Sequence, residues 1–378
     1  MKRWLRFAGI IAAMVLVLAA CSNKGATNDS DKKSADKSDK IEIKTTVYPL
    51  KSFAEQIGGE HVKVDSIYPS GTDLHDYEPT QKDMIKASES DLFIYTGDHL
   101  DPAAKKIAGT IKSDDKKLSL EKGLDKHALL KGGHDHEHEG EDHDHDHEGH
   151  KEDHDHGHDH DATKEEHDHD GEKEAHDHGH DHDANKEDHD HDHEGEEAHH
   201  HHGMYDPHVW LDPVLNQTFA KEIKDALVKK DPDHKAEYEK NYEKLVKDLK
   251  DIDASLKDVT KDKKDGVVYI SHESIGYLAK RYGFEQEGIQ NMNAEDPSQK
   301  TLTKIVKEIN DHDVKYILYE DNVATKVTDT IRKETKAEPL TFYNMESLNK
   351  EQEKDKKLTY QKLMEENIDN LGKALNGK

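Results

Sequence analysis

Between residues 41 and 95, short apolar segments alternate with segments whose apolar residues recur every three or four positions. Gly58-Gly59 would end the first of the helical segments, and Pro79 stands just before the second. The pattern predicts strands at 41–47, 62–68 and 91–95 and helices at 50–57 and 80–88. Strands and helices that alternate in this order favour a parallel α/β sheet.

The same alternation returns after Met204. An amphipathic helix is predicted at 216–229 and a long charged helix, without Pro or Gly, at about 234–261. A helix of that length would reach on the order of 40 Å and could link two lobes. Further strands are predicted at 266–270, 284–289, 315–319 and 339–343, and helices at 273–282, 298–312, 325–334 and 360–374.

The predicted fold class is therefore α/β, with two similar α/β lobes joined by a long backbone helix and a cleft between the lobes. We place the N-terminal lobe at 41–233, the linking helix at 234–262 and the C-terminal lobe at 263–378. The segment 134–202 interrupts the first lobe, and we expect it to be disordered without metal because it has almost no apolar residues.

This segment contains 24 of the 32 histidines of the chain, mostly in His-Asp pairs. The stretch from His154 to Ala162 returns 22 residues later as His176 to Ala184. The segment also has 29 Asp and Glu against four Lys, so that it carries a net charge of −25 out of −29 for the whole chain. The acidity is thus local, and it does not describe the surface of the two lobes. Candidate auxiliary metal ligands in the repeat are His154, His156, His158, His160, His176, His178, His180 and His182.

The N-terminus is typical of an export signal. Lys2, Arg3 and Arg6 precede an apolar run at 7–20, which is too short and wrongly flanked for a membrane-spanning helix. The run ends in Leu-Ala-Ala before Cys21, the only cysteine, and this resembles a bacterial lipobox. The resemblance implies cleavage after residue 20 and lipid attachment to Cys21. Polar residues 21–40 would then be a flexible tether to the membrane.

Three histidines outside the repeat lie at predicted strand ends or turns, where ligands are often held. His75 lies in Asp-Leu-His-Asp-Tyr, His208 in Asp-Pro-His-Val-Trp-Leu-Asp-Pro, and His272 in Ile-Ser-His-Glu. A single histidine in a turn more commonly makes surface hydrogen bonds. The comparable places of these histidines in two lobes favour a shared metal site.

These motifs, and the order of the elements around them, resemble the metal-binding solute-binding proteins of ABC transporters, in particular the zinc and manganese group. The resemblance covers residues 41–378, and the motif around His208 is its most specific part. It implies that the first lobe supplies His75 and His208, and that the second supplies His272 and one carboxylate. Glu346, after the last predicted strand, is similar in place to the family's fourth ligand. Glu320 is the competitor, with a structural carboxylate near the cleft floor as its alternative role.

Three imidazoles and one carboxylate, without a thiolate, suit Zn²⁺ in tetrahedral geometry better than manganese or calcium. In this family the manganese members look to have a carboxylate where His272 stands, and they usually lack a histidine-rich insertion. Copper(II) and nickel(II) also favour such ligands, and affinity alone does not exclude copper. The histidine-rich segment itself has three possible roles: a collector that raises the local zinc concentration, a buffer or sensor, or a solubilising insertion.

We expect a binding protein that captures Zn²⁺ outside the cell and delivers it to an ABC transporter permease. It would be a monomer, without a nucleic-acid partner. Alternatives are a transport protein for manganese or another divalent metal, a zinc buffer, and a host-contact adhesin. A zinc hydrolase would need an open coordination position and a general base, for which Glu273 is the candidate. No His-Glu-x-x-His motif, nucleophile elbow or phosphate loop is present, so no enzymatic activity is expected.

Overall fold

The computed structural model describes residues 40–132, 205–321 and 326–377. The predicted signal segment, Cys21 and the histidine-rich segment, including its eight candidate ligands from His154 to His182, lie outside the described residues. The described residues from Ile41 onward form one compact unit. Within the described ranges, no helix is both long and apolar enough to cross a membrane.

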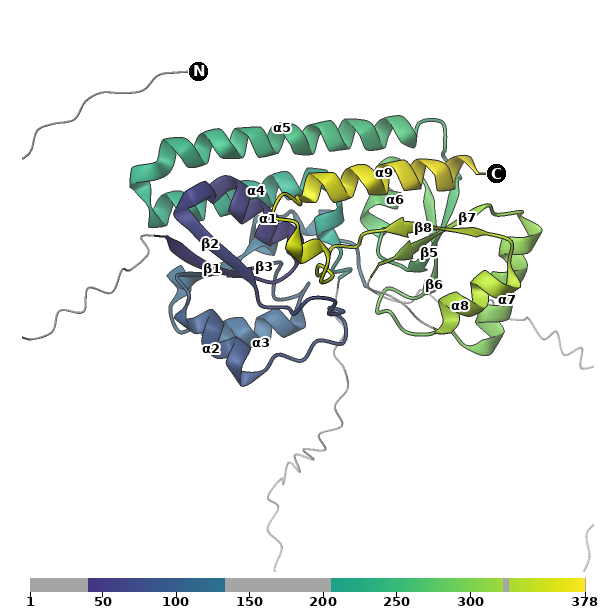
Figure 1. The fold of residues 1–378 in the computed structure, drawn as a ribbon, viewed down its shortest axis with the longest axis horizontal. Coiled ribbons are helices and arrows are strands. Elements are labelled where there is room, and N and C mark those ends of the chain that lie inside the picture. Colours follow the sequence, from purple (N-terminus) through teal and green to yellow (C-terminus); the bar gives the residue numbers. More distant parts are fainter. Residues whose placement is uncertain (1–39, 133–204, 322–325, 378) are drawn as a thin grey trace, which may run out of the picture. The chain divides into compact units, whose positions relative to one another are not determined.

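The N-terminal lobe contains a four-stranded, entirely parallel sheet in the order β2-β1-β3-β4 (Figure 1). Its strands are β1 (Ile41–Thr45), β2 (Val62–Ser66), β3 (Leu92–Tyr95) and β4 (Lys117–Ser119). Strand β3 reads Leu-Phe-Ile-Tyr and is buried along its whole length, as expected for a parallel strand covered on both faces.

The C-terminal lobe repeats this topology in the order β6-β5-β7-β8, again with parallel strands only. Its strands are β5 (Val267–His272), β6 (Glu285–Gln290), β7 (Tyr316–Glu320) and β8 (Glu338–Phe342). The prediction of two similar α/β lobes is therefore confirmed. In both lobes a helix connects each strand to the next strand in the sequence, as parallel pairing requires.

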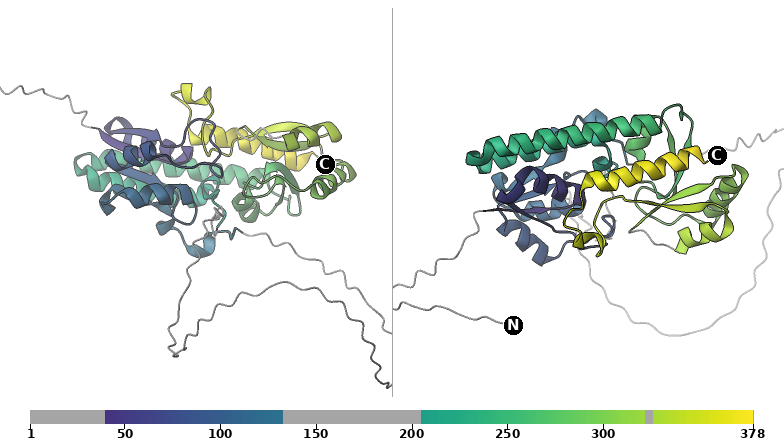
Figure 2. Two further views of the ribbon diagram at one scale, coloured as in Figure 1. Left: turned by 90° about the horizontal axis from the view of Figure 1, so that it is seen from below. Right: turned by 45° about the horizontal axis from the view of Figure 1, so that its top comes forward.

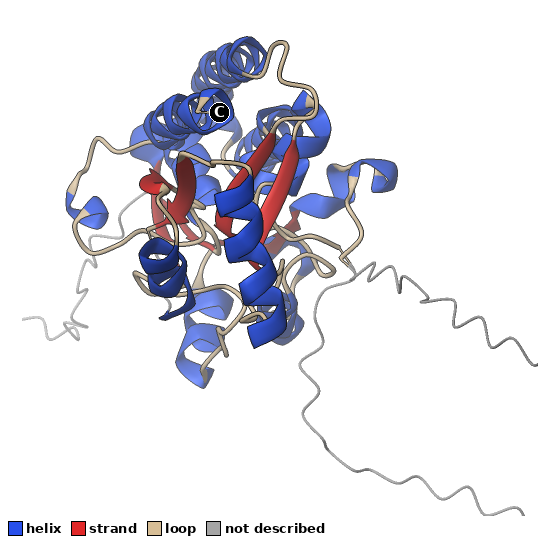
Figure 3. Ribbon diagram, turned by 90° about the vertical axis from the view of Figure 1, so that its right-hand side faces the viewer, coloured by secondary structure: helices blue, strands red, loops and turns tan. Residues whose placement is uncertain are grey.

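Helices lie on both sides of the strands (Figure 3). They are α1 (Tyr48–Gly58), α2 (Gln81–Glu89), α3 (Pro102–Thr110), α4 (Pro213–Lys230), α5 (Lys235–Val259), α6 (Gly276–Tyr282), α7 (Gln299–Asp311), α8 (Lys326–Glu334) and α9 (Tyr360–Asn376). Local signals set several of their starts. Thr80 and Asp83 form a capping box at α2, and Asp101 and Asp212 cap α3 and α4, each with proline as the next residue.

The long helix α5 runs alongside α9, and together they pass over both lobes (Figures 1 and 2). Along its length α5 packs against α1 and α4 of the first lobe and against α9, while α9 also packs on β5, β7 and β8. The main hydrophobic core is continuous from one lobe to the other. A second, smaller core lies in the C-terminal lobe, where α7 and α8 contribute Ile305 and Ile331.

Several predicted elements differ in their bounds. The helix predicted at 273–282 begins only at Gly276, because Ser274 donates from its backbone N–H to the His272 carbonyl (2.7 Å) and forms a turn. The preceding strand extends to His272 rather than ending at residue 270. Helix α3 and strand β4 were not predicted. The short helix α3 presents mostly alanine to the core, which gives a weak periodic signal.

Candidate metal centre

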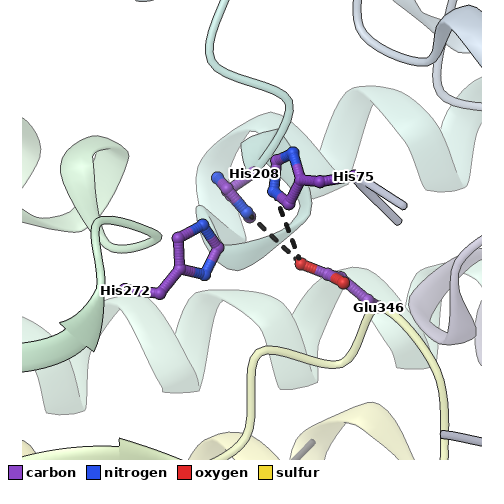
Figure 4. Close-up of side chains that lie close together, drawn as sticks. All are labelled: His75, His208, His272 and Glu346. Carbon is purple, nitrogen blue, oxygen red and sulfur yellow. Dashed lines mark ion pairs between the residues drawn. The ribbon is translucent and has the colours of Figure 1, made fainter. Parts of the chain in front are cut away.

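Four of the predicted site residues lie together: His75, His208, His272 and Glu346 (Figure 4). Each offers one ligand atom, and these four atoms lie within 4.8 Å of one another. His75 and His208 come from the first lobe, His272 ends β5 of the second, and Glu346 follows β8. All are buried except His75, whose side chain is 10% exposed.

His75 lies in the loop between β2 and α2. The backbone N–H of His75 donates to Oδ1 of Asp73 at 2.8 Å, an Asx-type turn that sets the direction of the loop. Nε2 of His75 is then 3.9 Å from Oε1 of Glu346. Burial and the nearby Glu346 raise the pKa of Asp73 to about 6.

His208 is held by a carboxylate two residues before it in the chain. Oδ1 of Asp206 lies 2.8 Å from Nδ1 and 2.9 Å from the backbone N of His208. Nδ1 therefore donates to Asp206, and Nε2 faces Oε1 of Glu346 at 3.5 Å. Burial lowers the pKa of His208, but Asp206 and Glu346 outweigh it and raise the pKa to about 10.

His272 lies fully buried at the carboxyl end of β5, a common position for ligands in parallel sheets. Its Nε2 is 3.1 Å from the carbonyl oxygen of Met292, and its Nδ1 is 3.2 Å from Oε2 of Glu320. Burial lowers the pKa of His272, whereas Glu320 raises it, and the net direction is upward.

Glu346 belongs to the second lobe by sequence, but its loop is hydrogen-bonded to the first lobe. Oε2 accepts from the backbone N–H of Leu74 at 2.8 Å, and Ser347 donates from Oγ to the Thr72 carbonyl at 2.9 Å. The preceding residue, Met345, has a φ of 61°, a strained conformation for a side chain of this size. Burial raises the pKa of Glu346, but the three histidines outweigh it and lower the pKa to about 2.

Glu320, the competing carboxylate, is outside the group of four. It is buried behind His272, where Ser271 and Ser274 donate from their Oγ atoms to its two oxygens at 3.1 and 2.7 Å. Both oxygens are therefore occupied by hydroxyl donors. This arrangement favours a role in orienting His272, whereas Glu346 lies directly against the other imidazoles.

Two atoms of the group are buried polar atoms without a hydrogen-bond partner among the described residues: Nε2 of His208 and Oε1 of Glu346. Such atoms are costly inside a protein unless they have a ligand. A tetrahedral zinc site with bonds of 2.0–2.1 Å places its ligand atoms about 3.3 Å apart. The separations of 3.5 and 3.9 Å between imidazole nitrogens and Glu346 are close to this spacing. The donor set thus suits a small divalent cation.

The residues that hold the candidate ligands in place were not predicted. Asp206 stands two residues before His208 in the most specific motif, and this spacing was the available signal. Asp206 also joins the lobes, because its carbonyl accepts from the hydroxyl of Tyr277 on α6 at 2.9 Å. A second link is the ion pair between Arg281 of α6 and Asp212, with Nε and Oδ2 2.6 Å apart.

Comparisons with known proteins agree with this architecture. Residues 43–374 match the family described as zinc-uptake complex component A, periplasmic. The high-affinity zinc uptake system protein ZnuA of Bacillus subtilis (strain 168) is 33% identical over 370 residues, which cover 97% of this chain and 96% of that protein. The zinc-binding lipoprotein AdcA of Streptococcus pneumoniae (strain R6) is 28% identical over 93% of this chain, which spans only 57% of AdcA.

Solved structures share the fold. The metal-dependent lipoprotein YcdH from Bacillus subtilis has a TM-score of 0.59 at 27% identity, over 89% of this chain and 99% of that one. The periplasmic zinc-binding protein TroA from Treponema pallidum has a TM-score of 0.64 at 18% identity, over the same shares, which supports the fold alone. Sequence, topology and comparisons together show that this chain belongs to the zinc-uptake complex component A family.

Proposed function

We propose that this protein is the extracellular zinc-binding component of an ABC importer. In this proposal His75, His208, His272 and Glu346 capture Zn²⁺ between the lobes. The main supporting observation is that these four side chains, from four separate regions of the sequence, bring their ligand atoms within 4.8 Å of one another in a buried setting. Family membership and the names of the relatives support zinc as the cargo.

The types of ligand atom in this group favour zinc over manganese. Three imidazole nitrogens and one carboxylate are a borderline donor set, whereas manganese favours more oxygen ligands. Asp206 holds Nδ1 of His208 and leaves Nε2 for the cation, which is the usual orientation of a carboxylate behind a zinc-bound histidine. Asp206 thereby sets the orientation of the ring, so that Nε2 is the nitrogen that binds the ion once its proton has left.

Delivery requires a membrane permease, and we propose that lipid on Cys21 holds the protein, as a monomer, at the extracellular face of the membrane beside it. The lipobox-like sequence and the AdcA relatives that are named lipoproteins support this placement. The histidine-rich segment 134–202 would act mainly as a collector of weakly bound zinc. Its buffer role is the alternative.

We propose no catalytic role. A zinc hydrolase keeps one coordination position open and places a general base beside it. Here Glu346 lies against His75 and His208 and would fill the fourth position itself. Glu273, the candidate base, is not part of the group of four.

Isothermal titration calorimetry tests the assignment. A variant with His75→Ala, His208→Ala and His272→Ala should lose the tight zinc site, and deletion of 134–202 should keep it with fewer weak sites. Glu346→Gln is a milder second variant that keeps the shape of the side chain. Circular dichroism on each variant checks the fold. Tight binding that is equal in the triple variant and in the wild type would reject the assignment.

A further inference from the structure

A second group of histidines and carboxylates lies in the N-terminal lobe, outside the site between the lobes. His61 ends a short 3₁₀ helix, Gly59–His61, that follows α1. Asp231 and His234 lie in the turn between α4 and α5, and Glu237 is in the first turn of α5. The α4–α5 turn is at the end of this lobe that faces away from the C-terminal lobe (Figure 1).

The two imidazole rings of this group are stacked, with centroids 3.7 Å apart and an angle of 21° between their planes. Each ring has its own carboxylate. Nε2 of His61 is 3.1 Å from Oε2 of Glu237, and Nδ1 of His234 is 2.6 Å from Oδ2 of Asp231. A neutral ring has a nitrogen lone pair, which is what a metal ion requires.

The ligand atoms already converge. One atom each of His61, Asp231 and His234 lies within 4.8 Å of the other two. Glu237 contacts His61 and is partly exposed, so that it can supply a fourth oxygen. Two neutral imidazoles and two carboxylates would balance the charge of a divalent cation.

The backbone around this group is held firmly. The hydroxyl of Tyr238, a buried residue, donates to Oδ2 of Asp231 at 2.7 Å. Asn241 donates from Nδ2 to the carbonyl oxygen of Ile57 at 3.1 Å, which fixes α5 against the end of α1. The side chain of His234, in contrast, is 44% exposed. A fixed backbone with exposed ligands suits an ion that exchanges readily with solution.

We propose that His61, Asp231, His234 and Glu237 form a second, solvent-facing site for a borderline divalent cation, with Zn²⁺ as the probe ion. The site does not depend on the group between the lobes, since it shares no residue with it. It binds more weakly than that group, because it is open to water and two of its four side chains are exposed by more than 40%.

Residue-resolved modification of histidines by diethylpyrocarbonate tests this proposal on the full chain. Free Zn²⁺ is set by a chelator buffer, so that the histidine-rich segment cannot deplete it, and modification is read by peptide mass spectrometry. Zinc should protect His61 and His234 together, along one titration curve. His99 is the matched control, because it pairs with a single carboxylate, Glu121, at 2.8 Å and is 53% exposed. It should stay reactive.

Two variants separate a shared site from binding at one ring. His61→Gln should abolish the zinc protection of His234. Asp231→Asn keeps an acceptor for Tyr238 and should shift protection to zinc concentrations at least about tenfold higher. Glu121→Gln should change neither curve. The second site would be overturned if His234 in His61→Gln were still protected at the wild-type zinc concentration. It would also be overturned if zinc protected neither ring in the wild type. Neither result would affect the assignment of the site between the lobes.

Discussion

Nε1 of Trp210 donates a hydrogen bond to the carbonyl oxygen of Asn344 at 2.6 Å. Trp210 stands two residues after His208, and Asn344 stands two residues before Glu346. This one bond therefore joins the motif that contains His208 to the loop that contains Glu346. Tyr48 adds a second bond, from its backbone N–H to the Met345 carbonyl at 3.2 Å.

We predict that Trp210→Phe weakens zinc binding as well as the fold. The substitution removes the indole N–H and leaves a small gap in a fully buried position, for a loss of about 2 kcal/mol in unfolding free energy. Because the Glu346 loop loses its anchor, zinc affinity should fall about tenfold, as measured by competition with a chelator.

Tyr343→Phe is the control for Trp210→Phe. It removes a hydrogen bond from the nearby hydroxyl of Tyr343 to Glu366, which is exposed (3.1 Å). Zinc affinity should stay within about twofold of wild type, since exposed hydrogen bonds contribute little. Equal affinities for the two variants would contradict the anchoring role of Trp210.

Glu346 belongs to the second lobe by sequence but is hydrogen-bonded to the first lobe, and this limits how the site can respond to motion between the lobes. His75, His208 and the Glu346 loop are mutually bonded through Leu74, Thr72 and Trp210. His272 joins them from β5, whose lobe is tied to the first lobe by Tyr277 and Arg281 of α6. With a core that continues across both lobes, large opening motions are disfavoured.

We predict that Arg281→Ala destabilises the protein by about 2 kcal/mol. The carboxylate of Asp212 is 1% exposed and would lose its ion-pair partner, although the 31% exposure of Arg281 reduces the effect below that of a fully buried pair. Asp212→Asn in the same chain should restore part of the stability, because the buried charge is then removed. Lys280→Ala, at the exposed neighbouring position, should be neutral in the same urea titrations. Additive effects of the two substitutions at 281 and 212 would show that the pair is uncoupled.

Zinc binding should release protons, and affinity should rise with pH. Asp206 and Glu346 raise the pKa of His208 to about 10 despite its burial, so that the ring is protonated at neutral pH in the metal-free protein. Zn²⁺ must displace this proton, and each proton displaced changes the apparent affinity by about tenfold per pH unit below the pKa. Calorimetry at pH 7 in buffers with different ionisation enthalpies counts the protons. An absence of proton release would contradict the assigned state of His208.

The two buried carboxylates should respond differently to substitution. Glu346→Gln should abolish tight zinc binding, because a neutral amide is a poor ligand. Glu320→Gln should retain one tight zinc ion with affinity lowered about 10- to 100-fold, as for residues that orient a ligand. Competition with a chelator measures both. The reverse order of effects would make Glu320 the fourth ligand.

Much of this arrangement was predictable from local signals. The repeated strand and helix pattern predicted two parallel α/β lobes, and His75, His208 and His272 each lie in a short polar motif at a strand end or turn. Glu346 was identified through resemblance. The bonds that anchor its loop were not predictable, because Trp210 and Asn344 are 134 residues apart and nothing local in either stretch signals the contact.

The pairing of His61 with His234 had no local signal for the same reason. The two rings are 173 positions apart in the sequence, and each alone looks like a surface histidine beside an acidic residue. Helix α3 had local signals, Asp101 followed by Pro102, but its alanine-rich face gave too little periodicity. The features that local sequence patterns did not predict thus depend on contacts between residues far apart in the sequence.

Anomalous diffraction from crystals of the zinc-loaded protein, recorded above and below the zinc absorption edge, tests the central claim most directly. We expect a zinc peak bonded at about 2.0–2.2 Å to one atom each of His75, His208, His272 and Glu346. No peak at these residues, or a zinc ion on the histidines with a water molecule in place of Glu346, would contradict it.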